Sequence, residues 1–238
     1  MRSETRYWAV VPAAGIGSRM GESVPKQYLD LNGRPVIEHA LQVLVDHSAI
    51  SRVVVAISET DHWWQTVSLS THRKIQSVPG GIERSDSVLN GLLSLHEQAN
   101  ETDWVLVHDA ARPCLNRDDL DKLIDTVSDH PVGGLLGYPL SDTIKRVDGE
   151  LSVLETLPRE QLWRAFTPQM FRYGVLRTAL EQARTNGVAV TDEASAVERQ
   201  GVQPKIIEGR SDNIKITRPE DLDLARFYLG NMAHKNNN

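Results

Sequence analysis

The fold of this chain is decided near its amino terminus, where the sequence reads Val10-Val11-Pro12-Ala13-Ala14-Gly15-Ile16-Gly17-Ser18-Arg19-Met20. Residues 7–11 are apolar and β-rich and end at a proline, which predicts a buried first strand. The small residues that follow would let a ligand lie directly against the peptide N–H groups of the loop. Arg19 and Lys26 come next, at a spacing that lets two cations close over a polyphosphate.

This loop differs from the two commonest phosphate-binding loops. A dinucleotide loop needs a third glycine where this chain has Met20, and the sequence contains no Gly-Lys-Ser or Gly-Lys-Thr of a P-loop. A glycine pair alone equally fits an ordinary tight turn after the first strand. The two cations beside it favour a nucleotide loop of a different design, and Met20 at the third glycine position disfavours a nicotinamide oxidoreductase.

Composition predicts one α/β domain over residues 1–238, with an insertion and a disordered tail at 234–238. A net charge of −6 argues against nucleic-acid or anionic-membrane partners. The single cysteine, Cys114, excludes an internal disulfide and a cysteine-based zinc site, which suits the reducing cytoplasm. No apolar stretch approaches the roughly 20 residues of a membrane helix, and the apolar segment after Arg6 is too short for a signal peptide. We therefore expect a cytoplasmic protein.

Apolar runs alternate with segments of helical spacing along most of the chain. Continuous apolar runs such as 53–57, within the predicted strand 52–57, and 104–107 are typical of parallel strands that are covered on both faces. This alternation predicts an α/β fold with a mostly parallel sheet. Residues 139–160 break the pattern, because Asp148-Gly149 between extended segments predicts a hairpin and no helix follows. We expect a projecting β-arm, and arms of this kind favour a homodimer.

Three polar clusters at predicted strand or helix ends each allow two interpretations. Gly80-Gly81 with Ser87 could hold a nucleotide or simply precede a helix capped by Ser85 or Asp86. Asp109 directly follows a strand, where it could hold Mg²⁺ or phosphate groups, or pair with Arg112. Asp192-Glu193 could be a paired-carboxylate site or an ordinary acidic helix start.

Seven motifs occur in order and together resemble one family. They are Pro12-Ala-Ala-Gly-x-Gly-x-Arg-Met20, Pro25-Lys-Gln-Tyr28, Asp86-Ser-Val88, His108-Asp-Ala-Ala-Arg-Pro113, Thr167-Pro-Gln169, Thr191-Asp-Glu-Ala194 and Asp212-Asn-Ile-Lys215. From Val10 to Leu229, the chain resembles the 2-C-methyl-D-erythritol 4-phosphate cytidylyltransferases, a family of enzymes in non-mevalonate isoprenoid synthesis. The resemblance implies a Rossmann-like nucleotidyltransferase core, a dimerising β-arm, CTP as co-substrate, Mg²⁺ and release of pyrophosphate.

The resemblance also implies roles for residues that match the family's motifs. Residues implied in catalysis are Arg19, Lys26, Lys215 and Arg159. Residues implied in holding the nucleotide are Pro12, Ala13, Ala14, Gly15, Gly17, Gly80, Gly81, Ser87 and Ala110. Residues implied in binding the sugar phosphate are Thr143, Arg112, Arg159, Thr167 and Lys215, with Thr143 and Arg159 serving the neighbouring subunit. Asp109 is implied as the metal ligand. Ile82 departs from relatives that have a polar or acidic residue there, so base recognition would rest more on backbone groups.

The expected chemistry agrees with the residues present. A phosphate oxygen is already ionised near neutral pH, since the second phosphate pKa is about 6, so the nucleophile needs no general base. The site must bring two polyanions together and absorb developing charge, for which Arg, Lys and Mg²⁺ are suited. A cytidylyltransferase for D-ribitol 5-phosphate is the closest alternative. A non-catalytic nucleotide-binding protein is more distant, because such a protein is expected to lose Lys26, Asp109 or Lys215.

Overall fold

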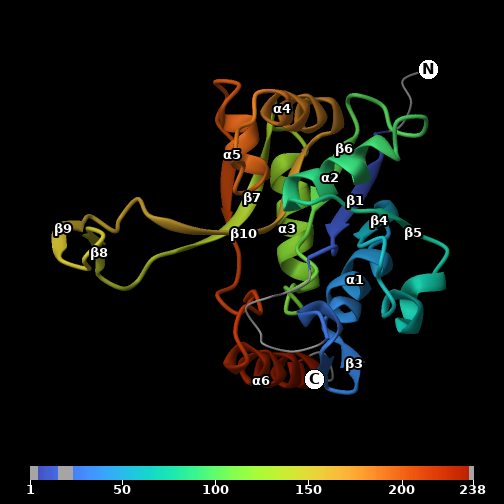
Figure 1. Cartoon of the computed structure of the whole chain (residues 1–238), viewed down its shortest axis with the longest axis horizontal. Helices are drawn as coiled ribbons and strands as arrows, with labels where there is room; N and C mark the ends of the chain where they lie inside the picture. Colours follow the sequence, from blue (N-terminus) through green and yellow to red (C-terminus); the bar gives the residue numbers. More distant parts are fainter. Residues whose placement is uncertain (1–4, 16–23, 236–238) are drawn as a thin grey trace.

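A computed structural model describes residues 5–15 and 24–235 of the chain, with side chains up to residue 232. Its centre is a seven-stranded sheet in the order β11-β7-β10-β6-β1-β4-β5 (Figure 1). The strands are β1 (Tyr7–Pro12), β4 (Ile50–Ile57), β5 (Ile75–Pro79), β6 (Trp104–Val107), β7 (Gly133–Pro139), β10 (Trp163–Arg172) and β11 (Lys205–Glu208). Only β10 runs antiparallel to its neighbours in this sheet, which confirms the predicted mostly parallel α/β fold.

Helices cover both faces of the sheet. They are α1 (Val36–Asp46), α2 (Arg84–Leu93), α3 (Arg117–Val127), α4 (Tyr173–Thr185) and α5 (Glu193–Glu198), whereas α6 (Glu220–Lys235) packs against the loop after β6. Short 3-10 turns lie at η2 (Lys26–Tyr28), η3 (Trp64–Thr66) and η4 (Ser68–Thr71), and β2 (Asp30–Leu31) pairs with β3 (Arg34–Pro35). None of the helices in the described ranges combines the length and the hydropathy that a membrane crossing requires.

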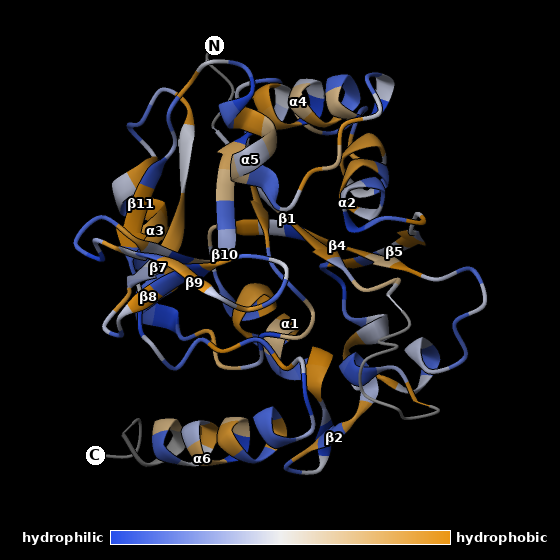
Figure 2. Cartoon of the chain, turned by 60° about the vertical axis from the view of Figure 1, so that its left-hand side comes forward, coloured by the Kyte–Doolittle hydropathy of each residue, from blue (hydrophilic) through white to orange (hydrophobic). Residues whose placement is uncertain are grey.

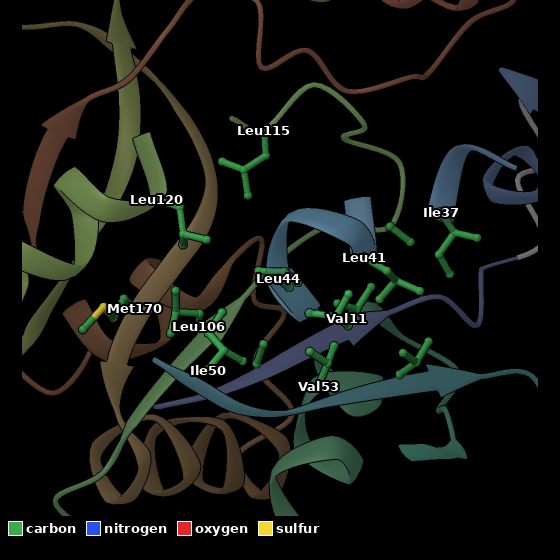
Figure 3. Packing of buried hydrophobic residues seen from close by; sticks show 14 of the residues in the cluster. Val11, Ile37, Leu41, Leu44, Ile50, Val53, Leu106, Leu115, Leu120 and Met170 are labelled. Atoms are coloured by element: carbon green, nitrogen blue, oxygen red, sulfur yellow. The ribbon is translucent and has the colours of Figure 1, made fainter. Parts of the chain in front are cut away.

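Alternating residues of β1 divide the core into two layers, because successive side chains of a strand point to opposite faces. Ala9 and Val11 pack with α1 and α3, and Figure 3 shows Val11 beside Leu41 of α1 and Val53 of β4. Trp8 and Val10 pack on the other face with α2, α4 and α5. All four of these β1 side chains are fully or almost fully buried. The neighbouring strand β4 is also mostly hydrophobic, as its colour in Figure 2 shows. This two-sided burial holds the carboxyl end of β1 rigidly.

A third, smaller core joins α6 to the loop after β6. Cys114 and Ile216 are completely buried there with Ala225 of α6. Burial raises the pKa of the Cys114 thiol to about 12, so this side chain packs as an inert thiol. α6 extends to Lys235, so the helix includes the first two residues of the segment 234–238, and the last three lie outside the described residues.

The predicted hairpin is present and projects from the body of the protein (Figure 1). β8 (Ile144–Val147) and β9 (Val153–Leu157) form a separate antiparallel pair. Asp148 accepts hydrogen bonds from the backbone of Glu150 and Ser152 and so closes the turn. Leu151, Val153 and Leu154 are exposed along this arm. The use of the arm for dimerisation remains a prediction.

Two local predictions were incomplete. β10 was not predicted as a strand, because Arg164 and Pro168 interrupt its apolar pattern. Only residues 166–171 of the strand are buried. The cap of α2 was placed at Ser85 or Asp86, whereas Glu83 is the N-cap and Asp86 returns the hydrogen bond in a capping box. The cap thus lies two residues before Ser85 and three before Asp86, which makes Arg84 the first residue of the helix.

The contact between α2 and β1 leads to a stability prediction. A Cβ on Gly91 would lie 2.6 Å from Cγ1 of Val10, and a β-branched side chain cannot turn away without strain. We expect Gly91→Ala to lower the free energy of unfolding by about 1–3 kcal/mol, measured by urea denaturation. Gly230→Ala in α6 meets no atom within 4 Å and should instead stabilise the helix. A Gly91→Ala variant as stable as wild type would contradict this packing.

Candidate active site

A cavity of about 670 Å³ opens at the carboxyl ends of the central strands. It is formed by the segment after β1, the start of α2, the loop after β6 and the segment before α6. The lining residues are Pro12, Ala13, Ala14, Gly15, Lys26, Gln27, Gly81, Ile82, Glu83, Arg84, Ser87, Asp109, Ala110, Ala111, Lys215 and Thr217. Ligands of open parallel sheets bind at this edge, so the cavity is the candidate site.

The described part of the glycine-rich loop is fixed from beneath by a buried glutamine. Nε2 of Gln27 donates to the carbonyl oxygens of Ala13 at 2.7 Å and Gly15 at 3.0 Å. The Ala13 N–H donates to the carbonyl of Ala56 at 2.7 Å, which continues the strand pairing. Because Gln27 binds the carbonyl oxygens of Ala13 and Gly15, the backbone of this loop is fixed where it borders the cavity. Gly17 and Arg19 lie outside the described residues.

The double glycine after β5 allows two loops to approach closely. A Cβ on Gly80 would lie 2.3 Å from Cβ of Ala14, and one on Gly81 would lie 2.2 Å from Cβ of Asp86. The Gly81 N–H donates to Oγ of Ser87 at 3.0 Å. Neither glycine could carry a side chain without moving the backbone, so the pair shapes one wall of the cavity.

Asp109 is the most densely paired charge of the site. Its carboxylate is 9% exposed and binds Nε of Arg84 at 2.9 Å through Oδ1 and Nζ of Lys215 at 2.8 Å through Oδ2. Nε of Arg112 lies 3.6 Å from the same Oδ2. Burial alone would raise the pKa of Asp109, but Arg84, Lys215 and Arg112 outweigh burial and hold that pKa well below its usual range. Asp109 is therefore an anion at any working pH.

A buried histidine and threonine hold the backbone beneath Asp109. Nε2 of His108 lies 3.1 Å from the carbonyl of Arg112, which can only accept, so Nε2 carries the hydrogen. Burial lowers the pKa of His108 to about 4, so the ring is neutral and Nδ1 accepts from the Thr167 hydroxyl at 3.0 Å. The same hydroxyl accepts the Asp109 N–H at 3.0 Å. The hydroxyl proton of Thr167 is thus committed to His108.

The segment before α6 crosses the cavity and is tied down at several points. Nζ of Lys26 donates to the carbonyl of Ile216 at 2.8 Å, and the Ile216 N–H donates to Ala111 at 2.8 Å. Asn213 binds the carbonyl of Thr167 through Nδ2 at 2.9 Å and accepts Nη1 of Arg112 on its own carbonyl. These bonds bring Lys26 and Lys215 to the same cavity from positions 189 residues apart (215 minus 26).

Comparisons with known proteins agree with this arrangement. Residues 7–231 match the model of the 2-C-methyl-D-erythritol 4-phosphate cytidylyltransferase family. Proteins of that name from Pseudomonas entomophila and Pseudomonas fluorescens are each 55% identical, over 92% and 94% of this chain and 94% and 96% of their own. The chain belongs to this family.

Solved structures support the family at the level of the fold. A crystal structure of a 4-diphosphocytidyl-2C-methyl-D-erythritol synthase has a TM-score of 0.82 and 38% identity, covering 95% of this chain and 99% of its own. The Francisella tularensis 2-C-methyl-D-erythritol 4-phosphate cytidylyltransferase also has a TM-score of 0.82, with 36% identity over 94% of this chain and all of its own. The likeness thus extends over the whole sheet and its helices.

The structure brings together most of the residues that the cytidylyltransferase resemblance implied. Those that line the cavity are Pro12, Ala13, Ala14, Gly15, Lys26, Gly81, Ser87, Asp109, Ala110 and Lys215. Gly80 and Thr167 lie behind this lining. Arg112 is 10% exposed, with its guanidinium 5.0 Å from the centre of the Phe166 ring, and it is not among the lining residues, although its Nε approaches Asp109. Thr143 and Arg159 are exposed on the arm, where Arg159 binds the carbonyl of Ser141.

Sequence reasoning missed Gln27, Arg84 and Thr217. Arg84 is the important omission, because its Nη1 and Nη2 bind Glu193 at 2.7 and 3.0 Å while its Nε binds Asp109. A signal for it was present. A cation in the first turn of a helix is disfavoured by the helix dipole, so an arginine there needs carboxylates nearby, and Asp109 and Glu193 are those partners.

The hydrogen bonds of Thr167 to His108 and to the Asp109 N–H can be tested by removing the hydroxyl group of Thr167. Thr167→Val keeps the shape but leaves Nδ1 of His108 and the Asp109 N–H unpaired and buried. We expect a loss of about 1–3 kcal/mol in the free energy of unfolding, measured by urea denaturation, and lower activity as Asp109 moves. Thr167→Ser, which keeps the hydroxyl, should recover most of both. Loss of activity in Thr167→Val at unchanged stability would instead mean that Thr167 acts only on a bound substrate.

Proposed function

We propose that this chain transfers the cytidylyl group of CTP to 2-C-methyl-D-erythritol 4-phosphate, giving 4-diphosphocytidyl-2-C-methyl-D-erythritol and pyrophosphate. The proposal is supported by the match to the family over residues 7–231 and by a cavity whose charged lining is mainly cationic. Lys26, Arg84 and Lys215 all reach this cavity. Such a lining suits two polyanionic reactants that must be brought together.

The proposed step is an in-line attack of the substrate phosphate on the α-phosphorus of CTP. A bond forms between a phosphate oxygen and the α-phosphorus while the bond to the pyrophosphate oxygen breaks, and no proton has to be removed from the nucleophile. The residues therefore work by orienting the two phosphates and by stabilising charge as it develops. The neutral, buried His108 is not required as a base.

Each cation has a proposed place in this step. Lys26 lies next to the glycine-rich loop and would contact the triphosphate, together with Arg19, which is outside the described residues. Lys215 is 36% exposed, so its ammonium group can turn from Asp109 to an incoming sugar phosphate. Ser87, Gly81 and the loop at 13–15 would hold the cytidine, with Ile82, 98% exposed, offering only an apolar surface.

Mg²⁺ is part of the proposal, with Asp109 as its protein ligand. In the described ranges no three acidic, histidine or cysteine side chains gather into a metal site. Mg²⁺ that keeps several waters and takes its other ligands from phosphates needs only one or two carboxylates. Oδ2 of Asp109 would bind such an ion, carried by the triphosphate, when Lys215 turns from it to the sugar phosphate. Such an ion would offset the charge of the phosphates.

The arm completes the proposal. Thr143 and Arg159 are not among the residues that line the cavity of their own chain, and the exposed apolar residues of the arm favour a second subunit. We propose a homodimer in which these two side chains bind the sugar phosphate in the partner's site. A cytoplasmic setting, where Cys114 stays reduced, is part of the same proposal.

The direct test is pyrophosphate release by the purified protein with CTP and Mg²⁺. We expect turnover with 2-C-methyl-D-erythritol 4-phosphate and little with D-ribitol 5-phosphate. Lys26→Ala and Lys215→Ala should each lower kcat by about 100-fold or more, because each removes a cation from the reacting phosphates. Lys205→Ala should leave kcat unchanged, because Lys205 is exposed on β11, away from the cavity and the arm. Preference for D-ribitol 5-phosphate would contradict the proposed substrate but not the cytidylyl transfer. Tight CTP binding without turnover of either sugar phosphate would contradict the proposed activity.

The shared site predicts complementation between two inactive variants. Arg159→Ala should disable the partner's site and Lys215→Ala its own, so each homodimer is inactive. After the two proteins are mixed and allowed to exchange subunits, heterodimers contain one intact site and activity should return. Mixtures that stay inactive, although exchange is demonstrated by size and labelling, would contradict the shared site.

A further inference from the structure

One buried ion pair has no role in the reaction as described so far. Glu193 is the first residue of α5, is 1% exposed and does not line the cavity. Its neighbour Asp192 caps α5 and accepts Nε2 of Gln169 at 2.8 Å. The two acids that the sequence placed together thus have separate tasks, and that of Glu193 is to bind Arg84.

Arg84 links this carboxylate to the reacting centre. Its two terminal nitrogens bind Glu193 at 2.7 and 3.0 Å, and its Nε binds Oδ1 of Asp109 at 2.9 Å. Asp109 in turn holds Lys215 through Oδ2. The result is a row of alternating charges, Glu193, Arg84, Asp109 and Lys215, that runs from buried helix α5 to the exposed edge of the cavity.

The orientation of Arg84 depends on Glu193. A guanidinium pairs most strongly with a carboxylate through two parallel hydrogen bonds, and here Glu193 takes the two terminal nitrogens while Asp109 receives only Nε. Without the charge on Glu193, the terminal nitrogens of Arg84 would turn to Asp109 and compete with Lys215 for its oxygens. Lys215 would then lose the position from which it meets a substrate phosphate.

We propose that Glu193 is a positioning residue for the cytidylyl transfer. It holds Arg84 so that Asp109 keeps one oxygen for Arg84 and the other for Lys215. This inference rests on the proposed function, because its effect is on the reacting phosphates. Glu193 itself touches no reactant, since it lies behind Arg84.

The test is Glu193→Gln, with Glu198→Gln as the matched control on the exposed end of the same helix. The amide NH₂ of glutamine would face an N–H of Arg84, so the paired hydrogen bonds cannot form. We expect kcat to fall by about 10- to 100-fold, because Lys215 would be displaced from the position in which it meets the substrate phosphate. The KM for CTP should stay unchanged or fall, because loss of the Glu193 carboxylate makes the net charge around the cavity more positive by one. Glu198→Gln should match wild type.

A purely structural role would give a different pattern. It would lower thermal stability and the amount of active protein but leave the kcat of the folded fraction unchanged, and wild-type kcat in folded Glu193→Gln overturns the proposal. If Glu193→Gln does not fold, Glu193→Asp keeps the charge but shortens the reach to Arg84, and wild-type kcat in that variant overturns it equally.

A double-mutant cycle shows whether Glu193 acts through Arg84. On an Arg84→Gln background, Glu193→Gln should cause no further loss of kcat, whereas multiplying losses overturn the proposal. If wild type releases no pyrophosphate with either sugar phosphate, the proposed function fails on its own. Calorimetric titration with CTP then decides the inference: Glu193→Gln must bind CTP at least as tightly as wild type, and weaker binding overturns it.

Discussion

The buried carboxylate of Asp109 is the interaction on which the rest of the site depends. Arg84, Lys215 and Arg112 all lie within 3.6 Å of it, and each comes from a different part of the chain. A lone buried carboxylate would cost several kcal/mol in lost hydration, and clustered cations would repel one another. The cations compensate the buried carboxylate, and the carboxylate reduces the repulsion between the cations. Because the charged groups must stay together, their pairing fixes the relative positions of α2, the loop after β6 and the segment before α6.

The topology of the sheet explains why these parts meet where they do. From β1 the chain proceeds to β4 and β5 on one side, and then returns to β6 on the other side of β1. The loops after β1 and β6 therefore diverge and leave a crevice at the carboxyl ends of the strands. The two hydrophobic layers anchor β1 on both faces, and the antiparallel β10 delivers Thr167 beneath Asp109.

Much of this could be predicted from local sequence signals. The strand and small-residue loop at 7–15, the parallel sheet and the hairpin after residue 140 follow from apolar periodicity and turn chemistry, which act over a few residues. The cavity lining was predicted largely because the motifs resemble a family, since the approach of Lys26 to Lys215 is a property of the folded chain. β10 carries polar residues that hide its pattern, and the pairing of Arg84 with Glu193 spans 109 residues, beyond the reach of any local rule.

The most direct test of this account is the kcat of Asp109→Asn, measured by pyrophosphate release from protein whose folding has been verified. Asparagine keeps the shape but removes the charge that holds Arg84 and Lys215 in place. The account predicts that kcat falls by about 100-fold or more while the protein remains folded. A kcat within a few-fold of wild type would contradict the claim that this carboxylate organises the cations of the site.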